Sequence, residues 1–322
     1  MYFHPNWFFL SVILLLLSGC SGFNDPPTIG ESEKMQHLFQ QANELPPESV
    51  IVRRTHYARP QNRPKIFRGN SGHGVILLHG FIGSPFEVME LVPKLQQKGF
   101  TALLPWMYRF GGDTESASGA SLADWRQSLL DAIDLLAREC DEISLVGFSL
   151  GGGLMVDYLL RTAEQEGKNP VHKIVLVAPY CRNYMFGGRA LASLTSLFTS
   201  SLPLSTLYSI SHHGDLMVPA SYPEYFNKDL PLQAVSTIFD LGDALESSSV
   251  GIKSSSPVLA LLSEKDAVVD AGQTTKFLHH HFADLSIINY PSEKEIRHQI
   301  LIRDTNPYLQ ESLNTIVSFL AD

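Results

Sequence analysis

Residues 147–151 read Gly-Phe-Ser-Leu-Gly and carry the clearest chemical motif of this sequence, with Ser149 at the centre. A predicted strand at 142–147 leads into the serine, and a helical pattern begins at Leu150. A turn this sharp between a strand and a helix strains the serine backbone and lifts its hydroxyl off the edge of a sheet, while the flanking glycines leave it room. Ser149 is therefore a candidate nucleophile, which at neutral pH needs a base held by a carboxylate.

A second motif lies at residues 79–85, which read His-Gly-Phe-Ile-Gly-Ser-Pro after a short apolar run at 75–78. The two motifs together resemble the α/β-hydrolase superfamily, and within it the bacterial carboxylesterase and monoacylglycerol-lipase type. The resemblance covers about residues 72–322, apart from a variable cap. It departs from the family at 110–113, where Phe-Gly-Gly-Asp replaces the Gly-His-Gly that often follows the third core strand.

The resemblance implies that the catalytic groups follow each other along the chain in the order serine, acid, histidine. Asp266 comes just after an apolar run at 257–262 and is the expected acid. Asp270, which we expect to begin the next helix, and Glu264 are the alternatives.

The base is expected after the last predicted strand, which ends near Tyr290, and His298 is the histidine at that place. Three consecutive histidines at 279–281 fall in a predicted helix, where successive side chains diverge by about 100° and do not converge on one metal ion. We expect the pair at 212–213 to be ordinary cap residues.

The resemblance also implies an oxyanion hole built from two backbone N–H groups, those of Phe81 and Leu150. His79 is expected to order its loop rather than to act as a second base. A serine at 149 argues against dehalogenase or epoxide hydrolase chemistry, for which the superfamily uses an aspartate there. Neither a cofactor nor a metal ion is expected.

From residue 72 onward, apolar runs alternate with helical patterns, which predicts an α/β fold with a mostly parallel sheet and helices on both faces. Ser84, Pro85 and Glu87 predict the start of one helix, because they are typical of the N-cap, the first and the third positions. Ser121 and Asp124 predict another. The predicted strands are 75–78, 100–105, 142–147, 173–178, 257–262 and 285–290, and the last helix is 308–320.

The alternation stops between 182 and 256, a stretch too long and too apolar for a simple loop, so we expect an inserted helical cap over the pocket. The predicted division is a signal peptide (1–19), a lipidated N-terminus and tether (20–50), a hydrolase core in two parts (51–181 and 257–322) and the cap (182–256). Within the N-terminal part we expect one short helix at 34–43 and extended segments at 49–67.

The first twenty residues contain no Asp, Glu, Lys or Arg, and residues 7–17 are apolar apart from one serine. As a helix this run reaches about 16 Å, too short for a hydrocarbon core of about 30 Å, so it fits a signal peptide. Residues 17–20 read Leu-Ser-Gly-Cys, which resembles a bacterial lipobox and implies that Cys20 is lipidated. Ser21 would then direct the protein to the outer membrane of a Gram-negative cell. An N-terminal signal-anchor is the alternative, because no Lys or Arg precedes the apolar run.

The composition describes a globular chain: 322 residues, 44% hydrophobic, with a net charge of −9. The acidic balance argues against a nucleic-acid partner. Of the three cysteines, Cys140 and Cys181 fall at opposite ends of the predicted sheet, about 15–20 Å apart. That separation is too large for a disulfide, so we expect two free thiols.

The sequence therefore predicts a serine carboxylic-ester hydrolase that acts on short- to medium-chain acyl esters, with monoacylglycerols as one candidate. A thioesterase or acyltransferase with the same triad is the nearest alternative. A noncatalytic ligand-binding protein of the same fold is the alternative from another class. Neither the acyl chain length nor the oligomeric state follows from the residues.

Overall fold

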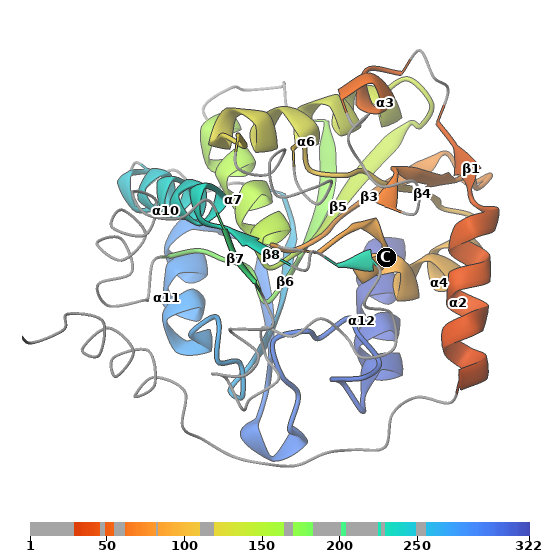
Figure 1. The fold of residues 1–322 in the computed structure, drawn as a ribbon. Helices are drawn as coiled ribbons and strands as arrows, with labels where there is room; N and C mark the ends of the chain where they lie inside the picture. Colours follow the sequence, from red (N-terminus) through yellow and green to blue (C-terminus); the bar gives the residue numbers. More distant parts are fainter. Residues whose placement is uncertain are drawn as a thin grey trace, which may run out of the picture.

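An eight-stranded sheet organises the chain in the order β1-β2-β4-β3-β5-β6-β9-β10 (Figure 1). The structure, a computed structural model, describes residues 29–45, 49–54, 62–81, 83–109, 119–163, 170–182, 201–203, 225–226, 229–248 and 256–322. All pairs from β4 to β10 are parallel, and the two short edge strands pair antiparallel. The strands are β1 (Asn43–Glu44), β2 (Lys65–Phe67), β3 (His73–Leu78), β4 (Thr101–Leu104), β5 (Glu142–Phe148), β6 (Val171–Val177), β9 (Val258–Ser263) and β10 (Leu285–Tyr290).

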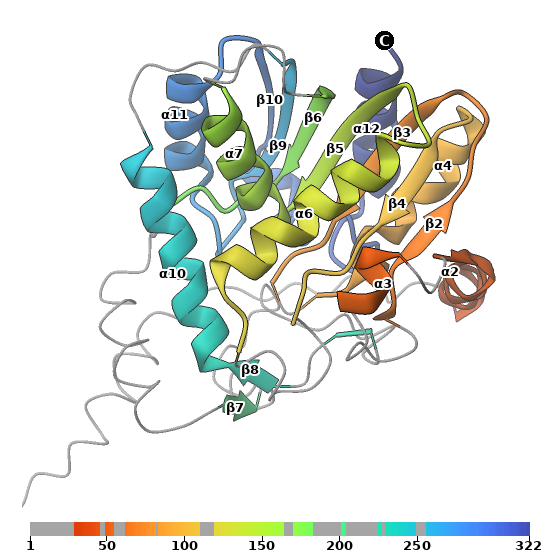
Figure 2. The same ribbon diagram turned by 90° about the horizontal axis from the view of Figure 1, so that it is seen from above.

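Helices cover both faces of this sheet (Figure 2). One face carries α3 (Val50–Arg54), α6 (Leu122–Leu136), α7 (Leu150–Thr162), α10 (Leu232–Ser247) and α11 (Ala271–His281). The other carries α2 (Ile29–Gln41), the 3-10 helix η2 (Pro85–Leu91), α4 (Val92–Gln97) and α12 (Leu309–Ala321). A further 3-10 turn, η5 (Ser292–Lys294), follows β10. The predicted α/β architecture is therefore confirmed.

The sheet separates two hydrophobic clusters, and the strand periodicity decides which side chain joins which. Along β3, Val75 and Leu77 pack on the η2–α4–α12 side, while Ile76 and Leu78 pack on the α6–α7 side. Successive side chains of a strand point to opposite faces, so a strand covered on both faces must be apolar throughout. This is why the core strands read as continuous apolar runs.

The two predicted helix starts differ in their capping. Ser121 and Asp124 form a reciprocal capping box at the start of α6. Ser84 accepts a hydrogen bond from the backbone N–H of Phe86, and Pro85 opens a helix that is 3-10 rather than α. Glu87 lies in the first turn of this helix, as expected, and its carboxylate accepts the N–H of Gly80.

The N-terminal segment differs from the predicted tether in that residues 29–45 pack against the domain (Figure 1). Met35 and Phe39 of α2 are buried, and the Phe39 ring meets those of Phe86 and Tyr225 edge-on at 5.4 and 5.7 Å. The strand β1 then extends the sheet by pairing with β2. Residues 50–54, expected to be extended, form the helix α3.

The N-terminal 28 residues, including Cys20 and the apolar run, lie outside the described residues. Within the described part of the chain, no helix has the length and apolar character to cross a bilayer.

The described part of the inserted segment consists of a two-stranded ribbon and a helix. The ribbon pairs β7 (Ser201–Pro203) antiparallel with β8 (Asp229–Pro231), and α10 follows directly. Leu241 and Leu245 of α10 join the cluster around α7, and the Thr237 hydroxyl donates to the carbonyl of Ala120 at 2.9 Å. The expected cover over the pocket and the histidines at 212–213 fall outside the described residues.

Cys140 precedes β5 and Cys181 follows its parallel neighbour β6, and the structure records both as free thiols. We expect iodoacetamide to alkylate both in the denatured, unreduced protein, as read by peptide mass spectrometry. In the folded protein Cys181 should stay unlabelled, because it is fully buried and burial raises the pKa of its thiol. A peptide pair linked by Cys140 and Cys181 would contradict this geometry.

Candidate active site

Three loops at the carboxyl edge of the sheet bring Ser149, His298 and Asp266 together. The hydroxyl Oγ of Ser149 lies 2.9 Å from Nε2 of His298. The other ring nitrogen of His298, Nδ1, lies 2.7 Å from Oδ2 of Asp266. Because these loops follow β5, β9 and β10, which run parallel in one sheet, their ends meet at the same edge.

The turn that presents Ser149 is strained as its sequence predicts. Ser149 adopts φ 50° and ψ −114°, a conformation that L-residues rarely populate. Its backbone is held on both sides, because its N–H donates to Val177 and its carbonyl accepts from Tyr180 and Gly153. A Cβ at Gly151 would stand 2.5 Å from the carbonyl oxygen of Leu78, so only glycine lets α7 approach the end of β3 this closely.

The tautomer of His298 follows from its partners. A carboxylate at Nδ1 can only accept, so Nδ1 carries the ring proton and Nε2 is left to accept the proton of the Ser149 hydroxyl. The imidazole is 5% exposed and lies 5.1 Å, centroid to centroid, from the ring of Phe148. This arrangement fits a general base rather than a surface histidine.

Of the three candidate carboxylates, only Asp266 reaches the imidazole. Its Oδ2 faces His298, while its Oδ1 accepts from the backbone N–H groups of Val268 and Val269 at 2.8 and 2.9 Å. Asp270 instead caps the first turn of α11, as expected from its place before that helix. Glu264 accepts from the N–H of Ser292 at the surface.

His79 is an uncharged histidine that hydrogen-bonds two backbone groups near the end of β3. Because the N–H of Met107 donates to its Nε2, the ring proton must sit on Nδ1, which donates to the carbonyl of Gly80 at 2.9 Å. Complete burial lowers the pKa of His79 to about 4, which keeps the ring neutral. The expectation that His79 orders its loop agrees with these contacts.

The loop at 79–83 fixes the peptide that carries the Phe81 N–H. The carbonyl of Gly80, in that same peptide, accepts from His79 and also from the N–H of Gly83. The C=O and N–H of a trans peptide point in opposite directions, so holding one sets the other. The close contact of Gly151 with Leu78 and His79 brings the beginning of α7, and with it Leu150, next to this loop.

Glu87 belongs to this site, although the sequence placed it only in the first turn of a helix. Its Oε2 accepts the N–H of Gly80 at 2.6 Å, and the residue is 4% exposed. Burial raises the pKa of this carboxyl to about 8, against a smaller opposing effect of the Gly80 N–H and of His298. The available signal was weak: one of two glutamates in a short helix that is otherwise apolar.

Glu87 makes the stability of the fold depend on pH in a defined direction. The folded protein keeps this proton up to about pH 8, whereas the unfolded chain loses it near the ordinary pKa of 4.5. Folding must therefore take up a proton between these values, and stability falls as pH rises through this window. We expect the stability of Glu87→Gln relative to the wild type to be greater at pH 9 than at pH 5, by on the order of a few kcal/mol. Urea unfolding of both proteins at both pH values measures this. The same difference in unfolding free energy between the two proteins at pH 5 and at pH 9 would contradict the prediction.

The other histidines do not gather around an ion in the described residues, where no group of three His, Cys, Asp or Glu side chains has metal-binding geometry. His281 packs its ring against Phe277 at 4.4 Å and meets the ring of His280 edge-on. The loop at 110–113, where the sequence departs from the resemblance, lies outside the described residues.

Comparison with known families places residues 70–306 in the family described as serine aminopeptidase, S33. A thermostable monoacylglycerol lipase of Bacillus sp. strain H-257 is 32% identical over 85 residues, which is 26% of this chain and 34% of that protein. A carboxylesterase of Bacillus subtilis strain 168 is 32% identical over 91 residues, or 28% of this chain and 37% of that protein. The chain thus spans about a third of the length of the curated relatives it matches.

Solved structures resemble the chain over most of its length. A structure of the metagenome-derived lipolytic enzymes LipS and LipT has a TM-score of 0.67 and 19% identity, and covers 82% of this chain and 98% of that one. A monoacylglycerol lipase of Paleococcus ferrophilus has a TM-score of 0.61 and 17% identity, and covers 80% and 97%. At such identities the likeness establishes the fold alone.

Proposed function

Because the chain belongs to the serine aminopeptidase S33 family of α/β-hydrolases, we propose that it is a serine carboxylic-ester hydrolase with Ser149 as its nucleophile. The observation that carries the proposal is the pair of hydrogen bonds that connects Ser149 to His298 and His298 to Asp266. The family is named for a peptidase activity, whereas the two curated relatives are a lipase and a carboxylesterase. The relatives favour an ester substrate.

In the first half-reaction the Ser149 oxygen attacks the ester carbonyl carbon while Nε2 of His298 takes the hydroxyl proton. The carbonyl oxygen becomes an oxyanion that the N–H groups of Phe81 and Leu150 stabilise, each worth about 3–4 kcal/mol when removed. The intermediate then collapses, the bond to the alkoxy oxygen breaks, and His298 returns the proton to the departing alcohol. Asp266 stabilises the imidazolium between these two proton transfers.

In the second half-reaction water replaces the alcohol. His298 takes one proton from the water as its oxygen attacks the acyl carbon, the bond to Ser149 breaks, and the proton passes to the Ser149 oxygen. The products are a carboxylic acid and the free enzyme. These steps need no cofactor.

The proposed substrates are acyl esters of short to medium chain length, monoacylglycerols among them. This proposal is supported by the activities for which the two relatives are named and by the apolar composition of the inserted segment. A thioesterase or acyltransferase would use the same relay, so the nature of the leaving and accepting groups must be measured. The intact relay argues against a noncatalytic binding protein.

A substrate panel on the full chain tests this function. We expect p-nitrophenyl esters of two to twelve carbons to be hydrolysed, with a maximum within that series, and a fluorophosphonate probe to label Ser149. Amino-acid p-nitroanilides, acyl thioesters and added glycerol as acceptor test the peptidase, thioesterase and acyltransferase alternatives. Absence of ester turnover, or turnover without an adduct on Ser149, would refute the proposal.

We also propose that Cys20 carries a diacylglycerol thioether and anchors the enzyme to a membrane outside the cytoplasm, the outer membrane in a Gram-negative cell. The support is the lipobox-like sequence at 17–20 followed by Ser21. Eight residues separate Cys20 from Ile29, where α2 begins. Fully extended they reach at most about 28 Å, so the catalytic domain would stay close to the lipid surface.

Mass spectrometry of the N-terminal peptide from bacterial membranes tests this anchor. We expect a chain that begins at a lipid-modified Cys20, and the Cys20→Ser variant should lose the modification and the membrane fraction. An unmodified Cys20, or an N-terminus that retains residues 1–19, would overturn the proposal and favour the signal-anchor.

A further inference from the structure

We propose that Glu87 is a positioning residue for the oxyanion hole and acts on the reaction through Gly80. The inference deepens the proposed function, on which it rests. Glu87 touches neither Ser149 nor Asp266 in the described structure, and the triad mechanism makes no use of it.

Gly80 is held by hydrogen bonds on both its N–H and its carbonyl. The N–H of Gly80 donates to Oε2 of Glu87 at 2.6 Å, and the carbonyl of Gly80 accepts from Nδ1 of His79 at 2.9 Å. Both peptide planes that meet at Gly80 are thereby fixed. The second of these planes carries the Phe81 N–H, so its direction depends on both contacts.

The contact between Glu87 and Gly80 also depends on a glycine at position 83. A Cβ at Gly83 would stand 2.3 Å from Oε2 of Glu87, so a larger residue there would push the carboxyl away from Gly80. The turn from Gly80 to Gly83 is closed by a backbone hydrogen bond of 3.3 Å. The carboxyl therefore occupies a space that the loop wraps around it.

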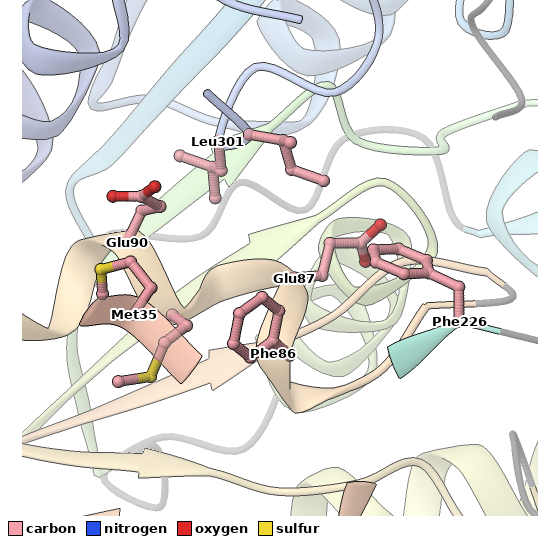
Figure 3. A pocket seen from close by; sticks show the side chains of 8 residues that line it. Met35, Phe86, Glu87, Glu90, Phe226 and Leu301 are labelled. Atoms are coloured by element: carbon pink, nitrogen blue, oxygen red, sulfur yellow. The ribbon is translucent and has the colours of Figure 1, made fainter. Parts of the chain in front are cut away.

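Glu87 also lines a small crevice (Figure 3), and the residue itself is 4% exposed. The walls of the crevice come from α2, η2, Phe226 and the turn after His298. Apolar side chains predominate among them, including Met35, Phe86, Phe226 and Leu301. Glu90, the other carboxylate of the crevice, is engaged by Arg303 at 3.1 Å and 3.2 Å.

The choice of a carboxyl follows from what the Gly80 N–H needs. A buried donor left without an acceptor is destabilised, and the peptide would rotate to find another partner. The ionisable and charged groups around Glu87 are His298, His79 and the Glu90–Arg303 pair. With its proton kept at neutral pH, Glu87 supplies an acceptor without placing a full negative charge beside the developing oxyanion.

The test compares Glu87→Met, which keeps the length of the side chain and removes the acceptor, with Glu87→Gln, which keeps the acceptor. We expect kcat for a p-nitrophenyl ester to fall about 10- to 100-fold in Glu87→Met with KM within twofold, because a misplaced donor acts on the transition state. Glu87→Gln should restore kcat to within about threefold of the wild type at pH 7.

A transition-state analogue separates positioning from a general loss of structure. A trifluoromethyl ketone adds to Ser149 and places an oxyanion in the hole, so its affinity should fall in Glu87→Met in proportion to kcat. Glu90→Gln, from the same helix and crevice, is the matched control and should change neither value. If Glu87→Met does not fold, the same comparison is made with Glu87→Leu.

The outcomes distinguish the two proposals. A wild-type protein without esterase activity would refute the proposed function. An active wild type together with unchanged kcat and analogue affinity in Glu87→Met would overturn the positioning role alone. An equal loss in Glu87→Gln and Glu87→Met would also overturn it, since the acceptor would then not be the property that matters.

Discussion

Replacement of Ser149 by alanine should reduce kcat for an ester substrate by about 10⁵- to 10⁶-fold, the scale for removal of a triad nucleophile. Without the hydroxyl, His298 has no proton to take at 2.9 Å and no covalent intermediate forms. The residual rate reflects the oxyanion donors acting on a water attack. Ester hydrolysis followed with p-nitrophenyl substrates, together with loss of fluorophosphonate labelling, measures this effect.

The matched control is Ser144→Ala on the same strand. Ser144 is as buried as Ser149, but its hydroxyl bonds to Nε2 of His73, in the half of β5 remote from the site. We expect this variant to keep kcat within about twofold while losing about 1 kcal/mol of stability. Thermal unfolding of both variants verifies that the alanine at 149 leaves the fold intact. A Ser149→Ala protein with half of the wild-type rate would show that another group performs the chemistry.

Much of this site was predictable because parallel strands place their carboxyl ends at one edge. Apolar runs identify the later strands, and Asp266 and His298 follow two of them. Because these strands are parallel to the one before Ser149, both residues are expected at the same edge of the sheet as the serine. The choice among Asp266, Asp270 and Glu264 was not settled by sequence, since all three follow the same strand. It depends on the turn in which Val268 and Val269 hold one oxygen of Asp266.

What the sequence missed depends on contacts between distant segments. Glu87 was expected only in the first turn of a helix, and its contact with Gly80 depends on how that helix meets the loop after β3. Likewise Met35 and Phe39 lie in a segment with little apolar periodicity. Their partners include Tyr225, which no local pattern connects to them. In both cases the partner lies in another segment of the chain, and no local pattern identifies it.

The three carboxylates after β9 can be separated by replacing each with its amide. We expect Asp266→Asn to lower kcat by about 10³- to 10⁴-fold. The reason lies in its second oxygen: the N–H groups of Val268 and Val269 demand an acceptor, so the amide carbonyl must take the place of Oδ1. The amide NH₂ then faces Nδ1 of His298 as a donor, which forces the ring proton onto Nε2, where it blocks transfer from Ser149.

The other two amides should leave this relay untouched. Asn caps helices as well as Asp does, so Asp270→Asn keeps the first turn of α11. Gln at 264 can still accept from the Ser292 N–H. Steady-state kinetics of the three variants decide between them, with kcat rather than KM as the discriminating value. If Asp270→Asn were the impaired variant, Asp270 and not Asp266 would be the acid of the triad. Near-wild-type kcat in Asp266→Asn would show that His298 keeps its working tautomer without a carboxylate, and it would contradict the role given to Asp266.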